Sequence, residues 1–188
     1  MTRTTAREIA VQLGFALCAK QQKPQEILDT FFDTDYYCTL AEENELFAQY
    51  PNEKQLQYIR TLATGVAEKK EELDGYISKY SKKWKLNRIS RTAVAIMRTA
   101  MYEVLYLPDV PDSVAVNEAV ELAKKYETPE TVTFINGLLG SFVREQANAT
   151  AEPATEAPVE ESAAVEPETA EMPMEESAPA APEQTSLF

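Results

Sequence analysis

Hydrophobic residues in the first 146 positions recur every three or four residues, the spacing that places them on one face of an α-helix. The opening segment is the clearest example, because its apolar stripe accompanies Thr5 and Glu8, a pair typical of a helix start. Alternation of period two, which would indicate strands, is scarce. The pattern therefore predicts an all-α fold. The stripe of the first helix consists of Ala6, Ile9, Ala10, Leu13, Ala16 and Leu17.

Prolines and capping residues divide the rest of the pattern, so that about six or seven helices are expected in all. Pro24 stands at the first position of a second helix. Residues 33–53 are acidic and aromatic with weak periodicity, which favours a loop with one helical turn. A basic connector over 81–90 follows a long helix. The expected helices after this loop span 53–80, 91–107, 114–126 and 129–146.

Four of the five glycines fall in the longest predicted helices. Gly65 and Gly75 interrupt the helix over 53–80, and Gly137 and Gly140 lie three residues apart in the last helix. A glycine inside a helix costs about 1 kcal/mol relative to alanine. We therefore expect each of them to mark a place where another helix packs closely.

The last 42 residues differ in composition from the rest of the chain. They contain ten acidic residues, no Lys or Arg, and six of the eleven prolines. Such a segment cannot bury enough apolar surface to offset its conformational entropy, so we expect a helical domain over 1–146 and a disordered acidic tail over 147–188. The net charge of −13 then divides into −3 for the body and −10 for the tail, and a nearly neutral body does not exclude a nucleic-acid partner.

Several kinds of chemistry are absent from the sequence. The chain has no histidine, which excludes histidine-containing zinc sites and histidine-based catalytic triads, and it has no glycine-rich phosphate loop. Cys18 and Cys38 lie far apart, and Cys18 is expected to be a small core residue. Glu118 and Glu121 are three residues apart, but a solvated helix face explains them better than a metal site. We expect no catalytic residues, no metal and no cofactor.

The expected cellular compartment follows from features that the sequence lacks. No apolar run approaches the length of a membrane span, and the first residues lack the apolar core of a signal peptide. A reducing cytoplasm is the expected compartment.

A basic segment is the main positive signal. No acidic residue occurs from Tyr76 to Tyr102, while seven basic residues and Trp84 do. Basic groups beside an aromatic ring suit single-stranded nucleic acid. For Trp84 itself a core anchor is the favoured interpretation, whereas the lysines could equally be a solvated surface. At the other end, Arg3 and Arg7 flank a helix start, where free N–H groups attract anions. The candidate RNA contacts of the connector are Lys82, Lys83 and Lys85.

Four stretches, taken in order, resemble the NusB family of transcription antitermination factors over about residues 3–146. The first is RTTAREIAVQL at 3–13, and the second is LATGV at 62–66 with LDG at 73–75. The third is WKLNRI at 84–89 with IMRTAMYEV at 96–104. The fourth is DVP at 109–111, followed by AVNEAVELAK at 115–124 and FINGLL at 134–139.

The resemblance implies a fold of two three-helix bundles and a protein without enzymatic activity. It further implies pairing with ribosomal protein S10, also called NusE, to bind boxA-type RNA of ribosomal RNA leaders in the antitermination complex of RNA polymerase. Tyr126 and Phe134 could stack on unpaired bases, although core packing is the alternative for both. Carried over by motif, the implied RNA-binding residues are Arg3, Arg7, Tyr126, Glu130 and Phe134.

Two departures from the family pattern concern binding. Many relatives have three or four arginines in the first helix where this chain has two, so we expect weak RNA binding without NusE. Relatives often have an acidic–basic pair at the NusE face, where this chain has Ala93 and Val94 beside Arg91.

A helical protein-interaction module without significant RNA binding is the alternative function, and the sequence leaves open whether the chain forms a homodimer. The targeting domain of a ribosomal RNA methyltransferase would need an α/β domain after residue 146.

Overall fold

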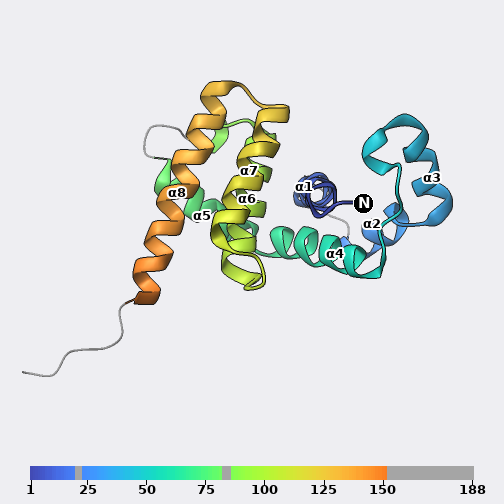
Figure 1. Cartoon of the computed structure of the whole chain (residues 1–188), viewed down its shortest axis with the longest axis horizontal. Helices are drawn as coiled ribbons and strands as arrows, with labels where there is room; N and C mark the ends of the chain where they lie inside the picture. The colour runs from blue at the N-terminus through green and yellow to red at the C-terminus, as the bar shows by residue number, and fades with distance from the viewer. Residues whose placement is uncertain (20–22, 82–85, 152–188) are drawn as a thin grey trace, which may run out of the picture. The chain divides into compact units, whose positions relative to one another are not determined.

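A computed structural model describes residues 1–19, 23–81 and 86–151 (Figure 1). Its described part is all-helical and contains no strand, which confirms the predicted fold class. Two short 3-10 turns, at Glu45–Phe47 and Leu86–Arg88, accompany eight α-helices. The helices are α1 Arg3–Ala19, α2 Pro24–Phe31, α3 Thr34–Glu43, α4 Glu53–Glu68, α5 Lys70–Tyr80, α6 Arg91–Tyr106, α7 Asp112–Tyr126 and α8 Pro129–Ala151.

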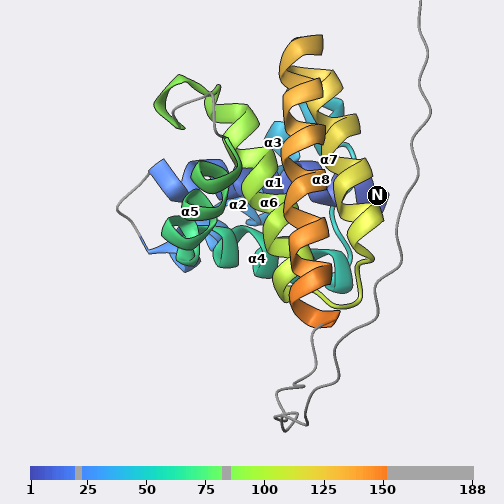
Figure 2. The ribbon, with the colours of Figure 1, turned by 90° about the vertical axis from the view of Figure 1, so that its left-hand side faces the viewer.

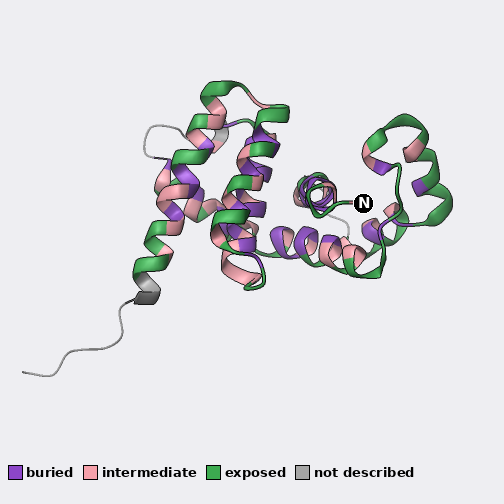
Figure 3. Cartoon of the chain, in the orientation of Figure 1, coloured by how far each residue is buried: buried purple, intermediate pink, exposed green. Residues whose placement is uncertain are grey.

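The helices form two bundles, which meet where α6 packs against α1 and α4. In the N-terminal bundle, α1 packs against α4, α2 contacts both of them, and α3 contacts α2 and the 3-10 turn at Glu45–Phe47 (Figure 1). In the C-terminal bundle, α6, α7 and α8 lie side by side with α5 against them (Figure 2). Buried residues occur on the helices of both bundles (Figure 3), and nearly all of the buried hydrophobic residues belong to one core cluster. Compared with the expected three-helix bundles, each contains one helix more.

The first additional helix is α3, in the segment that we expected to be mainly a loop. The carboxylate of Asp33 caps its start by accepting a hydrogen bond from the backbone N–H of Tyr36 at 3.1 Å. Its one buried residue is Tyr37, whose ring meets those of Phe31 and Phe47 edge to face, with the ring planes nearly perpendicular. Aromatic packing from outside the helix therefore stabilises a segment whose own apolar periodicity is weak.

The second additional helix arises because the long helix expected over 53–80 is interrupted at Lys69. The capping box that starts it, between Asn52 and Gln55, fixes the first residue of α4. Beyond Lys69 the axis changes, because the two halves bury their apolar stripes in different bundles. Leu62 in α4 and Ile77 in α5 are both fully buried, but α4 packs mainly on α1, whereas α5 packs on α6 and α8.

Helix ends follow the sequence pattern closely, with three differences. α7 begins at Asp112, two residues before the expected start. α1 begins at Arg3, three residues before the expected start, and the hydroxyl of Thr2 accepts from the N–H of Thr5 at 3.0 Å. Glu8 therefore does not cap the helix start together with Thr5, as the sequence pattern had predicted. α8 continues to Ala151, beyond the expected end near Gln146. None of the described helices is both long and apolar enough to cross a membrane.

Only one of the four glycines that we expected at close helix contacts lies at one. A Cβ atom on Gly65 would come within 2.1 Å of the Tyr102 ring, so α4 and α6 approach each other here because this position has no side chain. Around Gly75 and Gly137, a Cβ atom would have open space, and at Gly140 it would only touch the end of the Arg144 side chain. The prediction of close packing is confirmed for Gly65 and wrong for the other three.

Candidate nucleic-acid interface

Arg7 lies inside the protein, although it was predicted at an exposed anion site. Its Nε and Nη2 donate to the two carboxylate oxygens of Glu103 in α6, at 2.8 and 2.9 Å, and its Nη1 donates to Glu118 in α7 at 2.8 Å. Arg7 is 4% exposed and Glu103 is fully buried. Burial by itself lowers the pKa of Arg7, but the hydrogen bonds and charge of Glu103 raise it. The guanidinium therefore stays charged and joins three helices.

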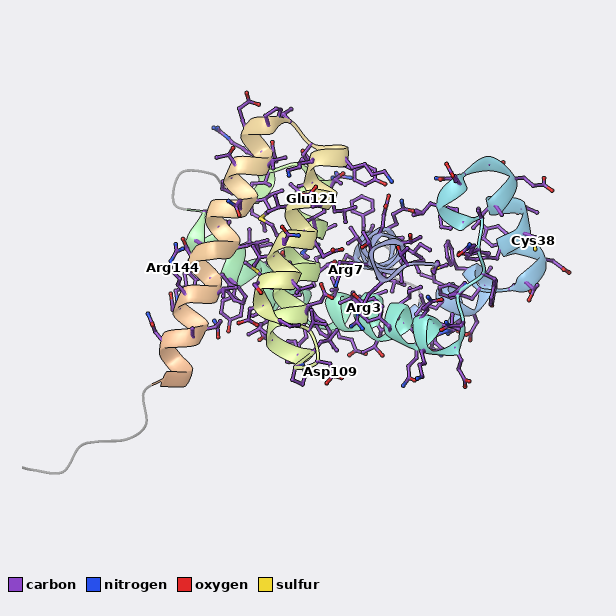
Figure 4. All side chains as sticks on the ribbon, viewed as in Figure 1. Arg3, Arg7, Cys38, Asp109, Glu121 and Arg144 are labelled. Atoms are coloured by element: carbon purple, nitrogen blue, oxygen red, sulfur yellow. The ribbon has the colours of Figure 1, made fainter. Side chains whose placement is uncertain are left out.

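Tyr58 of α4 extends this cluster to the surface. Its hydroxyl donates to Glu103 at 2.7 Å, and burial together with the charge of Glu103 raises the pKa of the phenol. The guanidinium of Arg3 lies over the face of the same ring, 4.5 Å from its centre. Arg3 is exposed, so it presents a cation at the start of α1 (Figure 4).

A second set of contacts joins α1 to the end of α7. The carboxylate of Glu8 accepts hydrogen bonds from the ammonium of Lys125, at 2.5 Å, and from the hydroxyl of Tyr126. Tyr126 is 44% exposed, so part of its side chain is accessible to a ligand even though its hydroxyl is held. The ammonium of Lys125, 5.4 Å from the centre of the ring, adds a positive charge beside it.

The start of α8 lies directly after Tyr126. The hydroxyl of Thr128 accepts from the N–H of Thr131 at 3.4 Å, and Pro129 occupies the first helical position, as predicted. Glu130 is exposed, and Phe134 is half-buried against the core. The structure therefore brings Arg3, Tyr126 and Glu130 to the surface, and it places Phe134 partly and Arg7 wholly inside.

The structure describes only part of the basic connector. Lys82, Lys83, Trp84 and Lys85 lie outside the described residues. Of the other basic residues, Lys79 pairs with Glu145, and Arg98 makes two hydrogen bonds to Asp74 at 2.7 and 2.8 Å. Arg88 and Arg91 are exposed. These described charges therefore divide between structural ion pairs and an accessible surface at the start of α6.

The three residues predicted at the partner face have different environments. Arg91 is exposed, but Ala93 is fully buried and Val94 is only 6% exposed. Val94 lines a groove of about 550 Å³ between α1, α5 and α6. The accessible apolar group of this groove is Phe15 of α1, which is 39% exposed. Its lining residues include Phe15, Cys18, Leu86, Ile89, Arg91 and Val94.

Five residues that take part in these contacts were missed by the sequence patterns. Glu103, Tyr58, Glu8 and Lys125 are ordinary members of helical patterns, and Phe15 looks like one more apolar position. Only the packing of α1 against distant helices shows what they contact. Glu118, expected on a solvated face, accepts from Arg7, whereas Glu121 pairs with Lys124 on the surface (Figure 4). The described residues contain no cluster of three potential metal ligands.

Comparison with known proteins gives consistent matches across the helical part of the chain. The model of the NusB family matches residues 4–144. Transcription antitermination protein NusB of Acetivibrio thermocellus is 41% identical over 145 residues, covering 77% of this chain and 90% of that protein. Its counterpart in Clostridium novyi is 37% identical over 145 residues, covering 77% and 99%.

Solved structures agree on the fold. T. maritima NusB is 28% identical, with a TM-score of 0.62 over 77% of this chain and 92% of that one. A crystal structure of antitermination factors NusB and NusE in complex with dsRNA is 20% identical, with a TM-score of 0.59 over 76% and 96%, and supports the fold alone. Because the family model and these relatives span nearly all of α1–α8, the chain belongs to the NusB family.

Proposed function

We propose that this chain is a transcription antitermination factor that binds boxA-type RNA together with NusE, within the antitermination complex of RNA polymerase. The observation that carries the proposal is the match to the NusB family over residues 4–144, with 41% identity to a protein named for antitermination. One solved relative of the same fold is a complex of NusB, NusE and dsRNA. The proposed role is that of a cytoplasmic adaptor without catalysis.

The proposed RNA surface runs from the start of α1 to the start of α8. Arg3 supplies a cation for phosphate, and the exposed ring of Tyr126 supplies a face for an unstacked base. Lys125, beside that ring, is added to the predicted set. Glu130 and Phe134 are proposed to lie at the edge of this RNA surface. Lys82, Lys83 and Lys85 stay in it as further phosphate contacts, because phosphate attraction is the sequence-independent part of RNA binding.

The proposed NusE surface is the groove between α1, α5 and α6. Ala93 and Val94 are too buried to be its centre, so Phe15 and Arg91 take that role. An exposed aromatic ring in a groove is typical of the residues that dominate protein–protein affinity. A smaller groove of about 200 Å³ has both Phe15 and Tyr126 in its lining, so the proposed partner and RNA surfaces adjoin over α1.

RNA binding in the presence and absence of NusE tests the function directly. The measurement is the affinity of a fluorescent boxA-type RNA for the full chain across a salt series. We expect NusE to raise that affinity about 5- to 150-fold, the usual range for two coupled binding sites. The RNA affinity of NusE alone is the control. Folded protein that shows no gain with NusE would contradict the proposal and favour a protein-interaction module without significant RNA binding.

A charge placed on Phe15 tests the NusE surface. We expect Phe15→Glu to weaken NusE binding by about tenfold or more, because it puts a carboxylate where an aromatic anchor would be buried. Calorimetric titration with NusE gives the affinity. The matched control is Cys38→Glu, which adds the same charge at an exposed position of α3 remote from the groove (Figure 4). Equal NusE affinity of the two variants would place the partner elsewhere.

A further inference from the structure

A chain of contacts connects the buried Arg7 with the exposed Arg3, one turn earlier on α1. Arg7 holds both oxygens of Glu103, Glu103 accepts from the hydroxyl of Tyr58, and the ring of Tyr58 lies under the guanidinium of Arg3. Arg7 and Glu103 lie 96 positions apart in the sequence, so only the packed fold forms this arrangement. These contacts fix the position of the Arg3 guanidinium, the first cation of α1.

The charges of the cluster explain why Arg3 belongs to it. Arg7 carries one positive charge, and Glu103 and Glu118 carry two negative charges, which leaves one negative charge in excess. Arg3 lies on the outer side of Tyr58, where its charge offsets this excess. The ring also restricts the guanidinium, and a restricted cation loses less freedom on binding a phosphate than a free side chain does.

Arg7 has little capacity for RNA. A guanidinium has five N–H donors, and three of those of Arg7 are already used by Glu103 and Glu118. Its side chain is 5% exposed, so a phosphate could reach it only if α1 separated from α6 and α7. Arg3, by contrast, is exposed.

We propose that Arg7 is a positioning residue, which through Glu103 and Tyr58 holds Arg3 at the surface, and that Arg3 is the cation of α1 that meets RNA phosphate. This inference rests on the proposed RNA-binding function and deepens it. On this proposal, only one of the two arginines in the first helix contacts RNA, and the other holds it in position.

The decisive experiment measures how RNA affinity depends on salt, with a boxA-type RNA and NusE present. Arg3→Ala should reduce the slope of log affinity against log salt by about 0.7, the value for one phosphate contact on a single strand. Adding Arg7→Met with Glu103→Gln to Arg3→Ala should then leave the slope unchanged. A further fall of about 0.7 would show that Arg7 contacts phosphate and would overturn the proposal. Arg60→Met with Asp29→Asn, an ion pair between α4 and α2, is the matched control.

A second experiment stays informative if the variants of Arg7 fail to fold. Tyr58→Phe keeps the ring and removes only the hydroxyl that links it to Glu103. We expect it to weaken RNA binding about threefold in the native background and not at all together with Arg3→Ala, because coupled residues are non-additive. Equal losses in both backgrounds would contradict the link. Tyr106→Phe, which removes a hydroxyl bound to Glu72 on the surface, is the control.

A measurement without RNA separates this inference from the proposed function. In nuclear magnetic resonance of arginine side chains, the Nε–H of Arg7 should exchange slowly with solvent, and Tyr58→Leu should increase the mobility of the Arg3 guanidinium. If these results hold and RNA does not bind, the proposed function fails while the positioning contacts stand. If Arg7 exchanges as fast as Arg3, the positioning role fails whatever the RNA does.

Discussion

Replacement of Arg7 by methionine is expected to lower the free energy of unfolding by about 3–5 kcal/mol, the usual cost of removing one member of a buried ion pair. The substitution would leave the fully buried carboxylate of Glu103 with Tyr58 as its remaining described hydrogen-bond partner. Urea denaturation followed by circular dichroism measures the effect. Since a domain of this size is stable by about 5–15 kcal/mol, the loss would be easily seen.

The combined variant Arg7→Met with Glu103→Met should recover much of this loss, because apolar groups of similar volume often replace a buried ion pair at little cost. For comparison, Arg60→Met removes the half-buried partner of the exposed Asp29 and should cost about 1 kcal/mol or less. If Arg7→Met is as mild as Arg60→Met, the cluster is not the fixed buried network that the structure describes.

Alanine at Gly65 and at Gly75 should change stability in opposite directions. At Gly65, the new methyl group overlaps the Tyr102 ring and forces α4 and α6 to adjust, which should destabilise the protein by about 1–3 kcal/mol. At Gly75, the methyl group meets open space, so alanine should stabilise α5 by up to about 1 kcal/mol through its better helix propensity. Thermal and urea denaturation of both variants provide the comparison.

Shortening the facing ring tests the cause at Gly65. In the double variant Gly65→Ala with Tyr102→Leu, the overlapping ring atoms are gone, and the two substitutions should cost less together than the sum of their separate costs. Additive costs would mean that Tyr102 is not what excludes a side chain at Gly65. Destabilisation by Gly75→Ala would likewise contradict the open environment of that position.

Much of the fold could be predicted because helix periodicity and helix ends are local properties. Pro24 and Pro129 mark helix starts, and the apolar pattern that stops at Leu107 marks a helix end. These signals depend only on the backbone within about one turn. α3 could not be predicted in this way, because its one buried ring is held by Phe31 and Phe47 from outside the helix. The break at Lys69 was missed for a similar reason, since the two halves of one apolar stripe pack into different bundles.

By itself, the sequence determined that this chain is helical, where most of its helices begin and end, and which family it resembles. Only the tertiary structure decided what individual side chains do. Arg3 and Arg7 stand four residues apart on one helix and look alike in the sequence, yet one is exposed and the other is 4% exposed. Their difference arises because packing brings Glu103 and Glu118, about a hundred positions away, onto Arg7 alone. Burial and charge pairing depend on such distant neighbours, and no local pattern in the chain encodes them.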